Sequence, residues 1–127
     1  MSDTQTTLYE LVGGERWFSE LVDDFYDRVA LDEVLRPLYP DDLTESRALL
    51  AGFLVQYWGG PATYSERRGH PRLRMRHQPF AIGQTERDAW YRHMRAAVLG
   101  RGLDHEIEAS VLAYFDHAAT AMINRPD

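Results

Sequence analysis

The 127-residue sequence predicts an all-α fold. Its apolar residues recur almost everywhere at spacings of one, three and four, which place them on one face of a helix, and strand-like alternation is rare. Glycine and proline interrupt the pattern between successive helices. The length suits one domain with a sizeable core, and no repeat or linker divides the sequence, so we expect residues 1–127 to form a single domain.

The first third predicts a short helix, a long helix and a tight corner. Thr7 and Glu10 have the spacing of a capping box, and Gly13–Gly14 ends the short helix that they begin. The long helix carries an apolar stripe of Trp17, Phe18, Leu21, Val22, Phe25, Tyr26 and Val29. Two prolines in the segment 36–40 exclude a long helix there, because a proline pushes the preceding residue toward extended geometry.

The middle of the chain combines one helix with an irregular segment. The helix ends at Gly59–Gly60–Pro61, and its stripe consists of Leu49, Leu50, Phe53, Leu54, Tyr57 and Trp58. From Pro61 to about Arg72 no period is visible, which predicts an irregular segment that is either functional or disordered. A short helix is predicted from Leu73 to His77.

Two longer helices are predicted in the last third. Thr85 and Asp88 are expected to cap the first, whose stripe is Ala89, Trp90, His93, Met94, Ala97 and Val98. The second carries Ile107, Val111, Tyr114, Phe115, Ala118, Met122 and Ile123, and we expect it to close at Asn124–Arg125–Pro126. The complete set is about four substantial helices with two or three short ones.

Charge and composition exclude several classes of protein. A formal charge of −6 disfavours nucleic acid and anionic membranes as partners, because both require a positive surface. Without cysteine, neither a disulfide framework nor a thiolate zinc site is available. No export signal or long apolar run is visible, so we expect a cytoplasmic protein, as a monomer or a homo-oligomer.

His77 is a candidate metal ligand. Its predicted helix follows an irregular segment and is ended by Pro79, while Met75 and Phe80 offer apolar contacts to a flat ligand. Imidazole is the commonest metal ligand and the usual proximal ligand of haem iron. A purely structural histidine is the alternative. Sites with several ligands are not predicted, because the spacing of His70 and His77 matches no zinc pattern.

Five arginines precede this histidine within ten residues, in an otherwise acidic chain. Crowded like charges repel, so their density predicts a local anion, such as the two carboxylates of a buried flat cofactor. Solvated surface arginines are the alternative. A nucleic-acid site would require interleaved aromatics and the opposite net charge. The cluster consists of Arg67, Arg68, Arg72, Arg74 and Arg76.

Tyr26, Tyr39 and Trp90 form a second candidate set. We expect Tyr26 and Trp90 on inward helix faces and Tyr39 in the proline corner. A buried hydroxyl or indole N–H must find a partner, and three such donors would be costly in a dry core. A bound ligand that accepts hydrogen bonds would satisfy them.

Taken together, five segments resemble the group II truncated haemoglobins, in particular their actinobacterial branch. They are Gly13–Gly14, FYDRV around Tyr26, LYP around Tyr39, QYWGGPATYSERRGHPRLRMRHQPF over residues 56–80, and ERDAWYRHM around Trp90. The resemblance covers nearly the whole chain. It implies a truncated globin fold, a two-over-two helical sandwich around haem b.

The resemblance also implies roles for individual residues. It assigns His77 to the haem iron and Tyr26, Tyr39 and Trp90 to the distal side, where they act on the bound gas. The expected cofactor contacts are Phe25, Ser46, Leu50, Phe53, Tyr64, Met75, Arg76 and Phe80, with Arg76 and Tyr64 near the propionates. Ser46 occupies a gate position that commonly holds alanine, and its hydroxyl either adds a hydrogen bond or points away.

The implied function is reversible binding of oxygen, and of carbon monoxide and nitric oxide, with slow oxygen release. Oxidation of nitric oxide to nitrate or reduction of peroxide would fit, and either needs an external electron donor, since no dinucleotide fingerprint follows a strand. Whether the protein is an enzyme stays open at this point. The alternatives are oxygen storage or delivery, a gas sensor with a separate partner, and a helical interaction module without haem.

Overall fold

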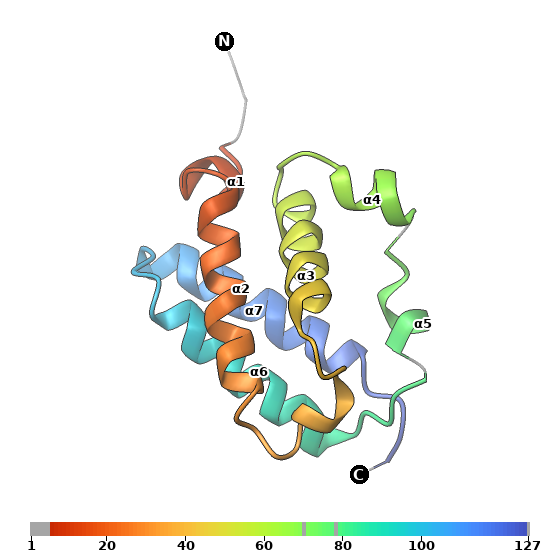
Figure 1. Ribbon diagram of the computed structural model, residues 1–127. Helices are drawn as coiled ribbons and strands as arrows, with labels where there is room; N and C mark the ends of the chain where they lie inside the picture. The colour runs from red at the N-terminus through yellow and green to blue at the C-terminus, as the bar shows by residue number, and fades with distance from the viewer. Residues whose placement is uncertain (1–5, 70, 78, 127) are drawn as a thin grey trace. The chain divides into compact units, whose positions relative to one another are not determined.

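A computed structural model describes residues 6–69, 71–77 and 79–126 and, within them, is helical throughout its regular structure (Figure 1). His70, and the side chains of Leu73 and Arg74, lie outside what is described. None of the described helices is long and apolar enough to cross a bilayer. The elements are α1 (Leu8–Leu11), α2 (Glu15–Val29), the 3₁₀-helix η1 (Arg36–Leu38), α3 (Thr44–Tyr57), α4 (Thr63–Arg68), α5 (Leu73–His77), α6 (Gln84–Leu99) and α7 (His105–Ala121).

The contacts within the chain define two compact units. The first comprises Met1–Asp23 and Asp42–Pro71, and the second comprises Asp24–Asp41 and Arg72–Asp127. The boundary falls within α2, whose predicted apolar stripe is confirmed: except for the half-buried Trp17, its residues are no more than 5% exposed. Burial of each large side chain stabilises the fold by about 1.5 to 3 kcal/mol.

In the first unit, the predicted cap of α1 is present. The Thr7 hydroxyl accepts a hydrogen bond from the Glu10 backbone N–H at 3.2 Å, and the Glu10 carboxylate accepts one from the Thr7 backbone N–H at 3.1 Å. The segment after α3 packs tightly on this turn. A Cβ at Gly59 would lie 2.6 Å from Thr7, and one at Gly60 would lie 2.5 Å from Val55, so only glycine fits either position.

The prediction that the segment from Pro61 to about Arg72 is irregular is wrong in part, because α4 forms within it. Its N-cap, Ala62, offers no side-chain acceptor. Gln56 of α3 supplies one instead: its Oε1 accepts from the Ser65 backbone N–H at 2.8 Å, and its Nε2 donates to the Ser65 hydroxyl at 2.7 Å. The cap therefore comes from a different helix, and local sequence patterns do not contain it.

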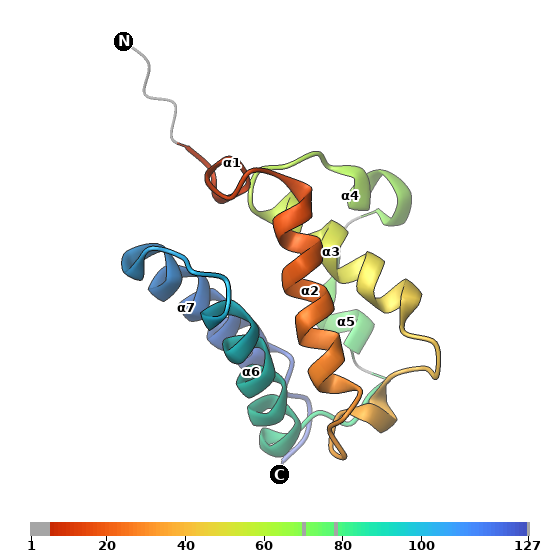
Figure 2. The same ribbon diagram turned by 60° about the vertical axis from the view of Figure 1, so that its left-hand side comes forward.

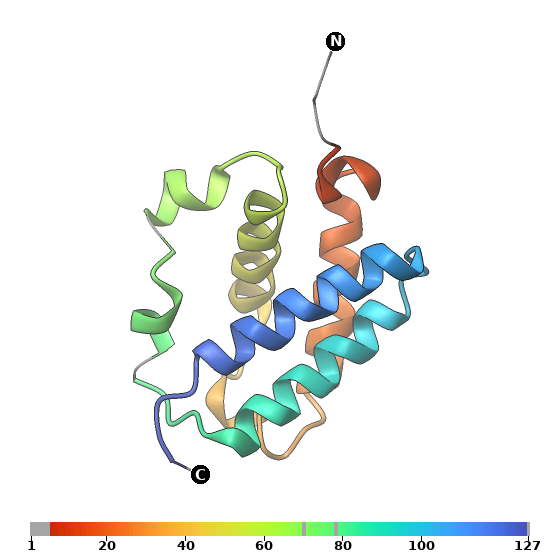
Figure 3. The ribbon, with the colours of Figure 1, turned by 180° about the vertical axis from the view of Figure 1, so that it is seen from behind.

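In the second unit, α6 and α7 run antiparallel side by side, as Figures 2 and 3 show. The predicted stripes are buried at their centres, where Met94 and Val98 are fully buried and Val111 and Phe115 are at most 2% exposed. Other predicted members, such as Ile107 and Tyr114, are half-buried, and α7 ends at Ala121, before Met122 and Ile123. The start of α6 differs from the prediction based on Thr85 and Asp88. Glu86 caps it by accepting from the Gly83 backbone N–H at 2.7 Å.

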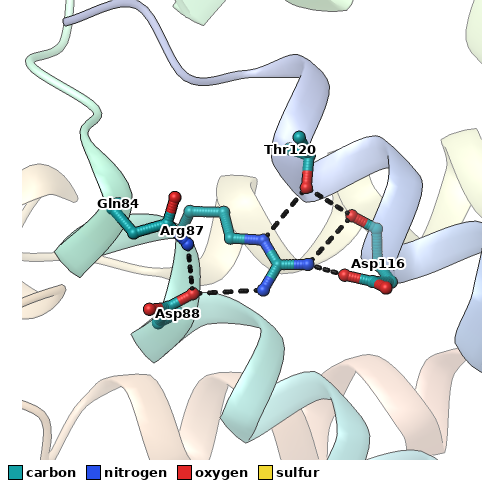
Figure 4. A network of polar contacts seen from close by, with 5 residues as sticks. All are labelled: Gln84, Arg87, Asp88, Asp116 and Thr120. Carbon is teal, nitrogen blue, oxygen red and sulfur yellow. Dashed lines mark hydrogen bonds and ion pairs between the residues drawn. The ribbon is translucent and has the colours of Figure 1, made fainter. Parts of the chain in front are cut away.

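Arg87 joins α6 to α7 through a polar network (Figure 4). Its Nε donates to the Thr120 hydroxyl and its Nη2 to the Asp116 carbonyl, each at 3.2 Å, and the guanidinium also pairs with the Asp116 carboxylate. On its own helix, Nη1 contacts Asp88 at 3.1 Å. The Arg87 side chain is 13% exposed, so its ion pair with Asp116 is less screened than the Arg16–Glu20 pair, in which Arg16 is 90% exposed.

Candidate functional site

Tyr26, Tyr39 and Trp90 lie together in the second unit. The Tyr26 and Tyr39 ring centroids are 5.5 Å apart, and the rings are nearly perpendicular. Side-chain hydrogen bonds join Tyr39 to both Tyr26 and Trp90. Because an indole N–H can only donate, Trp90 donates to the Tyr39 hydroxyl oxygen. The set predicted from sequence is therefore one connected group, called here the distal triad.

Tyr39 is half-buried, and its hydroxyl is hydrogen-bonded to Tyr26 and Trp90. Burial raises its pKa to about 12, although the hydrogen bonds from Trp90 and Tyr26 act in the opposite direction. Tyr39 therefore remains a neutral phenol at physiological pH and can donate its proton. We expected three donors without protein partners, but they bond to one another, which corrects the argument that only a bound ligand could satisfy them.

Two phenylalanine rings pack against the distal triad. Phe25 is fully buried, with its ring centroid 5.0 Å from that of Tyr26 and 5.1 Å from that of Trp90. Phe115 of α7 lies 5.9 Å from Trp90 on the same measure. Contacts of this geometry each add about 0.5 to 1.5 kcal/mol to area burial, and they restrict how Trp90 can turn.

The corner that carries Tyr39 is held by two charged side chains that the sequence did not single out. At its start, Asp32 Oδ1 accepts from the backbone N–H groups of Val34 at 2.7 Å and Leu35 at 3.0 Å. Farther along, the Arg36 guanidinium donates to three backbone carbonyls, those of Tyr39, Pro40 and Asp41, at 3.3, 2.9 and 2.8 Å.

Asp32 also contacts α6 through His93. The Asp32 Oδ2 atom lies 2.5 Å from His93 Nε2. Burial acts to raise the pKa of Asp32, but hydrogen bonds from His93, Leu35 and Val34 outweigh it and hold this pKa below its ordinary value. Asp32 is therefore a carboxylate, which accepts only, so His93 donates from Nε2–H.

The candidate iron ligand, His77, is the last residue of α5 and is half-buried. Its neighbours Met75 and Phe80 are 55% and 43% exposed, and Arg76 is also exposed. Asn124, which the sequence marked only as a helix end, holds this segment. Its Nδ2 donates to the carbonyls of His77 at 3.2 Å and Phe80 at 2.8 Å, and its Oδ1 accepts from the Ile82 N–H at 2.9 Å.

The remaining predicted contacts belong to the first unit. Ser46, Leu50 and Phe53 are half-buried on α3. Tyr64 is 8% exposed, and its ring lies 5.7 Å from that of Phe53 in an edge-to-face contact. Of the predicted arginine cluster, Arg68 lies 3.7 Å from the Glu45 carboxylate, so at least this arginine has an anion within the chain.

A family model described as bacterial-like globin matches residues 7–124. The chain belongs to the bacterial-like globin family. Within the family, this globin is 43% identical to the group 2 truncated haemoglobin of Bacillus subtilis strain 168, over 94% of this chain and 89% of the relative. The group II resemblance inferred from the motifs is thereby confirmed.

Solved structures agree with this assignment. The thermostable haemoglobin of the actinobacterium Thermobifida fusca superposes with a TM-score of 0.93 at 54% identity, covering 96% of this globin and 100% of that chain. A truncated haemoglobin from Bacillus subtilis gives a TM-score of 0.88 at 43% identity, covering 94% and 100%. The truncated globin fold is confirmed, and the family's haem iron is the cofactor.

The residues around His77 fit such a cofactor. Among the described residues, no three His, Asp or Glu side chains come together as a metal-ligand set. Haem iron needs only one axial imidazole, because the porphyrin supplies the other ligands. The large apolar side chains of Met75 and Phe80, exposed beside His77, suit the apolar face of a porphyrin, and Arg76 suits its carboxylates.

Proposed function

We propose that this globin binds diatomic gases at haem iron held by His77 and retains oxygen by hydrogen bonds from the distal triad, for redox chemistry rather than carriage. The observation that carries the proposal is the hydrogen-bonded set of Tyr26, Tyr39 and Trp90. The haem would supply the bond to the gas and the change of oxidation state. The protein supplies the donors, the orientation of the ligand and the exclusion of water.

Because Trp90 and Tyr26 donate to the Tyr39 oxygen, the Tyr39 hydroxyl proton is the one that can turn to a bound gas without breaking these bonds. The indole N–H and the Tyr26 hydroxyl become donors to the gas if their bonds to Tyr39 open. A bound gas whose outer atom carries partial negative charge accepts such hydrogen bonds strongly. A hydrogen bond to a charged acceptor is worth about 1.5 to 3 kcal/mol, which slows ligand release roughly tenfold to a hundredfold. In support, the Bacillus subtilis structure that matches at 43% identity is described as a truncated oxygen-avid haemoglobin.

We assign the cofactor surroundings on the same basis. His77 would hold the haem iron, and Arg76 and Tyr64 would lie near the propionates. Leu50, Phe53, Met75 and Phe80 would contact the porphyrin, and Ser46 would occupy the gate position. Phe25 acts mainly through the triad, because its fully buried ring packs against Tyr26 and Trp90.

The redox chemistry we favour is the conversion of nitric oxide and oxygen to nitrate. Conversion of one nitric oxide and one oxygen molecule to one nitrate ion consumes one electron, and a donor outside this chain must supply it. Retention by the triad favours this reaction, because oxygen that stays bound is available when nitric oxide arrives. Peroxide reduction has the same requirement for an external donor.

Rapid mixing with nitric oxide tests the proposal. The reduced, haem-loaded protein is equilibrated with oxygen and mixed with nitric oxide, and nitrate is quantified alongside the Soret spectrum. We expect one nitrate for each haem within the mixing time, with conversion to the ferric spectrum. Absence of nitrate, or its formation only over minutes, would exclude this reaction as the function.

The internal bonds of the triad support a second candidate, oxygen storage or delivery. If the Trp90–Tyr39 hydrogen bond persists when the gas is bound, the indole proton is not available to the ligand. Oxygen would then leave quickly and reversibly. The oxygen release rate separates this candidate from the first.

A further inference from the structure

We propose that Asp32 and His93 are a positioning pair that sets the hydrogen bond between Tyr39 and Trp90 and so tunes how long the globin holds oxygen. The part that concerns oxygen rests on the proposed function of the distal triad. The pair itself follows from contacts within the second unit. Neither residue is expected to touch the gas or the haem.

The first step is the control of the corner by Asp32. Its Oδ1 binds two successive backbone N–H groups, those of Val34 and Leu35, immediately before η1 (Arg36–Leu38). Leu35, which precedes η1, is 2% exposed and anchors the same turn in the core. One carboxylate, whose side chain is 8% exposed, therefore fixes the direction in which the chain enters the 3₁₀-helix.

The second step carries this direction to Tyr39. Arg36, the first residue of η1, donates to the carbonyls of Tyr39, Pro40 and Asp41. Pro37 restricts the backbone between these contacts. The segment from Asp32 to Asp41 consequently moves as one piece, and a displacement at Asp32 reaches the Tyr39 ring.

The third step joins this piece to α6 beside Trp90. Asp32 Oδ2 accepts from His93 Nε2 at 2.5 Å, with the two side chains 8% and 19% exposed. His93 lies three residues after Trp90, so both stand on the same face of the helix. The Asp32–His93 bond therefore fixes the segment 32–41 to α6 close to Trp90, whose indole N–H donates to Tyr39.

Arg92 provides a built-in comparison. Its Nη2 contacts the same oxygen, Asp32 Oδ2, at 3.3 Å, but its side chain is 64% exposed. A solvated contact of this kind contributes little. A variant of Arg92 therefore removes a positive charge near Asp32 and leaves the hydrogen bond from His93 in place.

The experiment uses the haem-loaded protein, three variants of the pair and its neighbour, and Trp90→Phe as the reference for the triad. His93→Leu removes the donor, His93→Gln replaces it with an amide N–H, and Arg92→Ala is the matched control. The first readout is the NMR shift of the Trp90 indole N–H in the carbon monoxide form, which reports the hydrogen bond directly. The second is the rate of oxygen release after rapid mixing with an oxygen scavenger.

We expect His93→Leu to shift the indole resonance and to change oxygen release by roughly fivefold, the effect of losing one ordinary hydrogen bond. His93→Gln should restore much of both readouts, and Arg92→Ala should alter neither. If His93→Leu does not fold, Asp32→Asn takes its place as a change of nearly equal shape, with the same expected result.

An unchanged indole resonance in His93→Leu or Asp32→Asn would overturn the positioning role. An equal effect of Arg92→Ala would also overturn it, since the effect would then be one of charge. If the indole shifts and Trp90→Phe alters oxygen release but His93→Leu does not, the tuning of oxygen is wrong. If the indole shifts but Trp90→Phe leaves release unchanged, the positioning role stands and the proposed function of the triad fails.

Discussion

The indole N–H of Trp90 donates a hydrogen bond to the hydroxyl of Tyr39, which joins α6 (Gln84–Leu99) to the corner after α2. Both Trp90 and Tyr39 are potential hydrogen-bond donors to a bound gas, and this bond couples them to each other. A gas ligand must either add its acceptor to the existing bond network or displace part of it. The strength of oxygen retention depends on which of these occurs, and several variants distinguish them.

Tyr39 should make the stability of the globin sensitive to alkali. Its folded pKa of about 12 lies above the ordinary value of 10.0, so the folded state favours the neutral phenol. This contribution is complete below pH 10 and is lost as the pH rises toward 12. Between pH 9 and pH 12 the free energy of unfolding should fall by about 2 to 3 kcal/mol more in the wild type than in Tyr39→Phe. Urea denaturation of both proteins measures this, and parallel curves would contradict it.

His77→Ala should lose haem, because no other axial ligand is proposed on α5. The measurement is the rate at which haem passes from the variant to an apoglobin acceptor, followed in the Soret band. The matched control is His117→Ala, which removes an exposed histidine of α7. Retention of a wild-type five-coordinate ferrous spectrum in His77→Ala would show that the axial assignment is wrong.

Asn124 should hold the segment that follows His77. Asn124→Ala removes three side-chain hydrogen bonds and should lower the free energy of unfolding by about 1 to 3 kcal/mol. Asn124→Asp keeps an acceptor for the Ile82 N–H and loses both donors. Amide exchange at Ile82 should therefore increase in the alanine variant and much less in the aspartate variant. Equal exchange in the two would argue against this assignment of atoms.

Arg87 should stabilise the pairing of α6 with α7 through its fork of donors. Arg87→Ala should cost about 1 to 3 kcal/mol, and Arg87→Lys should recover little of it, because an ammonium cannot reach Thr120 and Asp116 with the same geometry. Urea denaturation gives the values. The comparison is Arg16→Ala, which breaks the exposed pair with Glu20 and should cost less than about 0.5 kcal/mol. Full rescue by lysine would mean that charge alone matters.

The sequence predicts those parts of the fold that depend on local pattern. The stripe of α2, the capping box of Thr7 and Glu10, and the end of α3 before Gly59 are all where periodicity and turn chemistry place them. Each of these signals lies within a few residues of the structure that it specifies. Local patterning is sufficient there, because neighbouring side chains decide the conformation.

Several features that sequence reasoning missed depend on contacts between residues far apart in the chain, although the bonds of Asp32 and Arg36 within the corner and the Glu86 cap of α6 are local. Helix α4 receives its cap from Gln56, nine residues before Ser65. Asp32 reaches His93 across 61 residues, and Asn124 reaches His77 across 47. A polar side chain whose hydrogen-bond partner lies on another helix leaves no local pattern in the sequence. The triad was predicted as a set, but the bonding among its members depends on the folded geometry.

The most direct test of the account is the rate of oxygen release from the reduced wild type, Trp90→Phe, Tyr39→Phe and the double variant. We predict slow release in the wild type and an increase of roughly tenfold to a hundredfold in each single variant. The double variant should fall short of the product of the two, because the residues share one hydrogen bond. Fast release from the wild type, unchanged in the variants, would show that the triad does not hold oxygen.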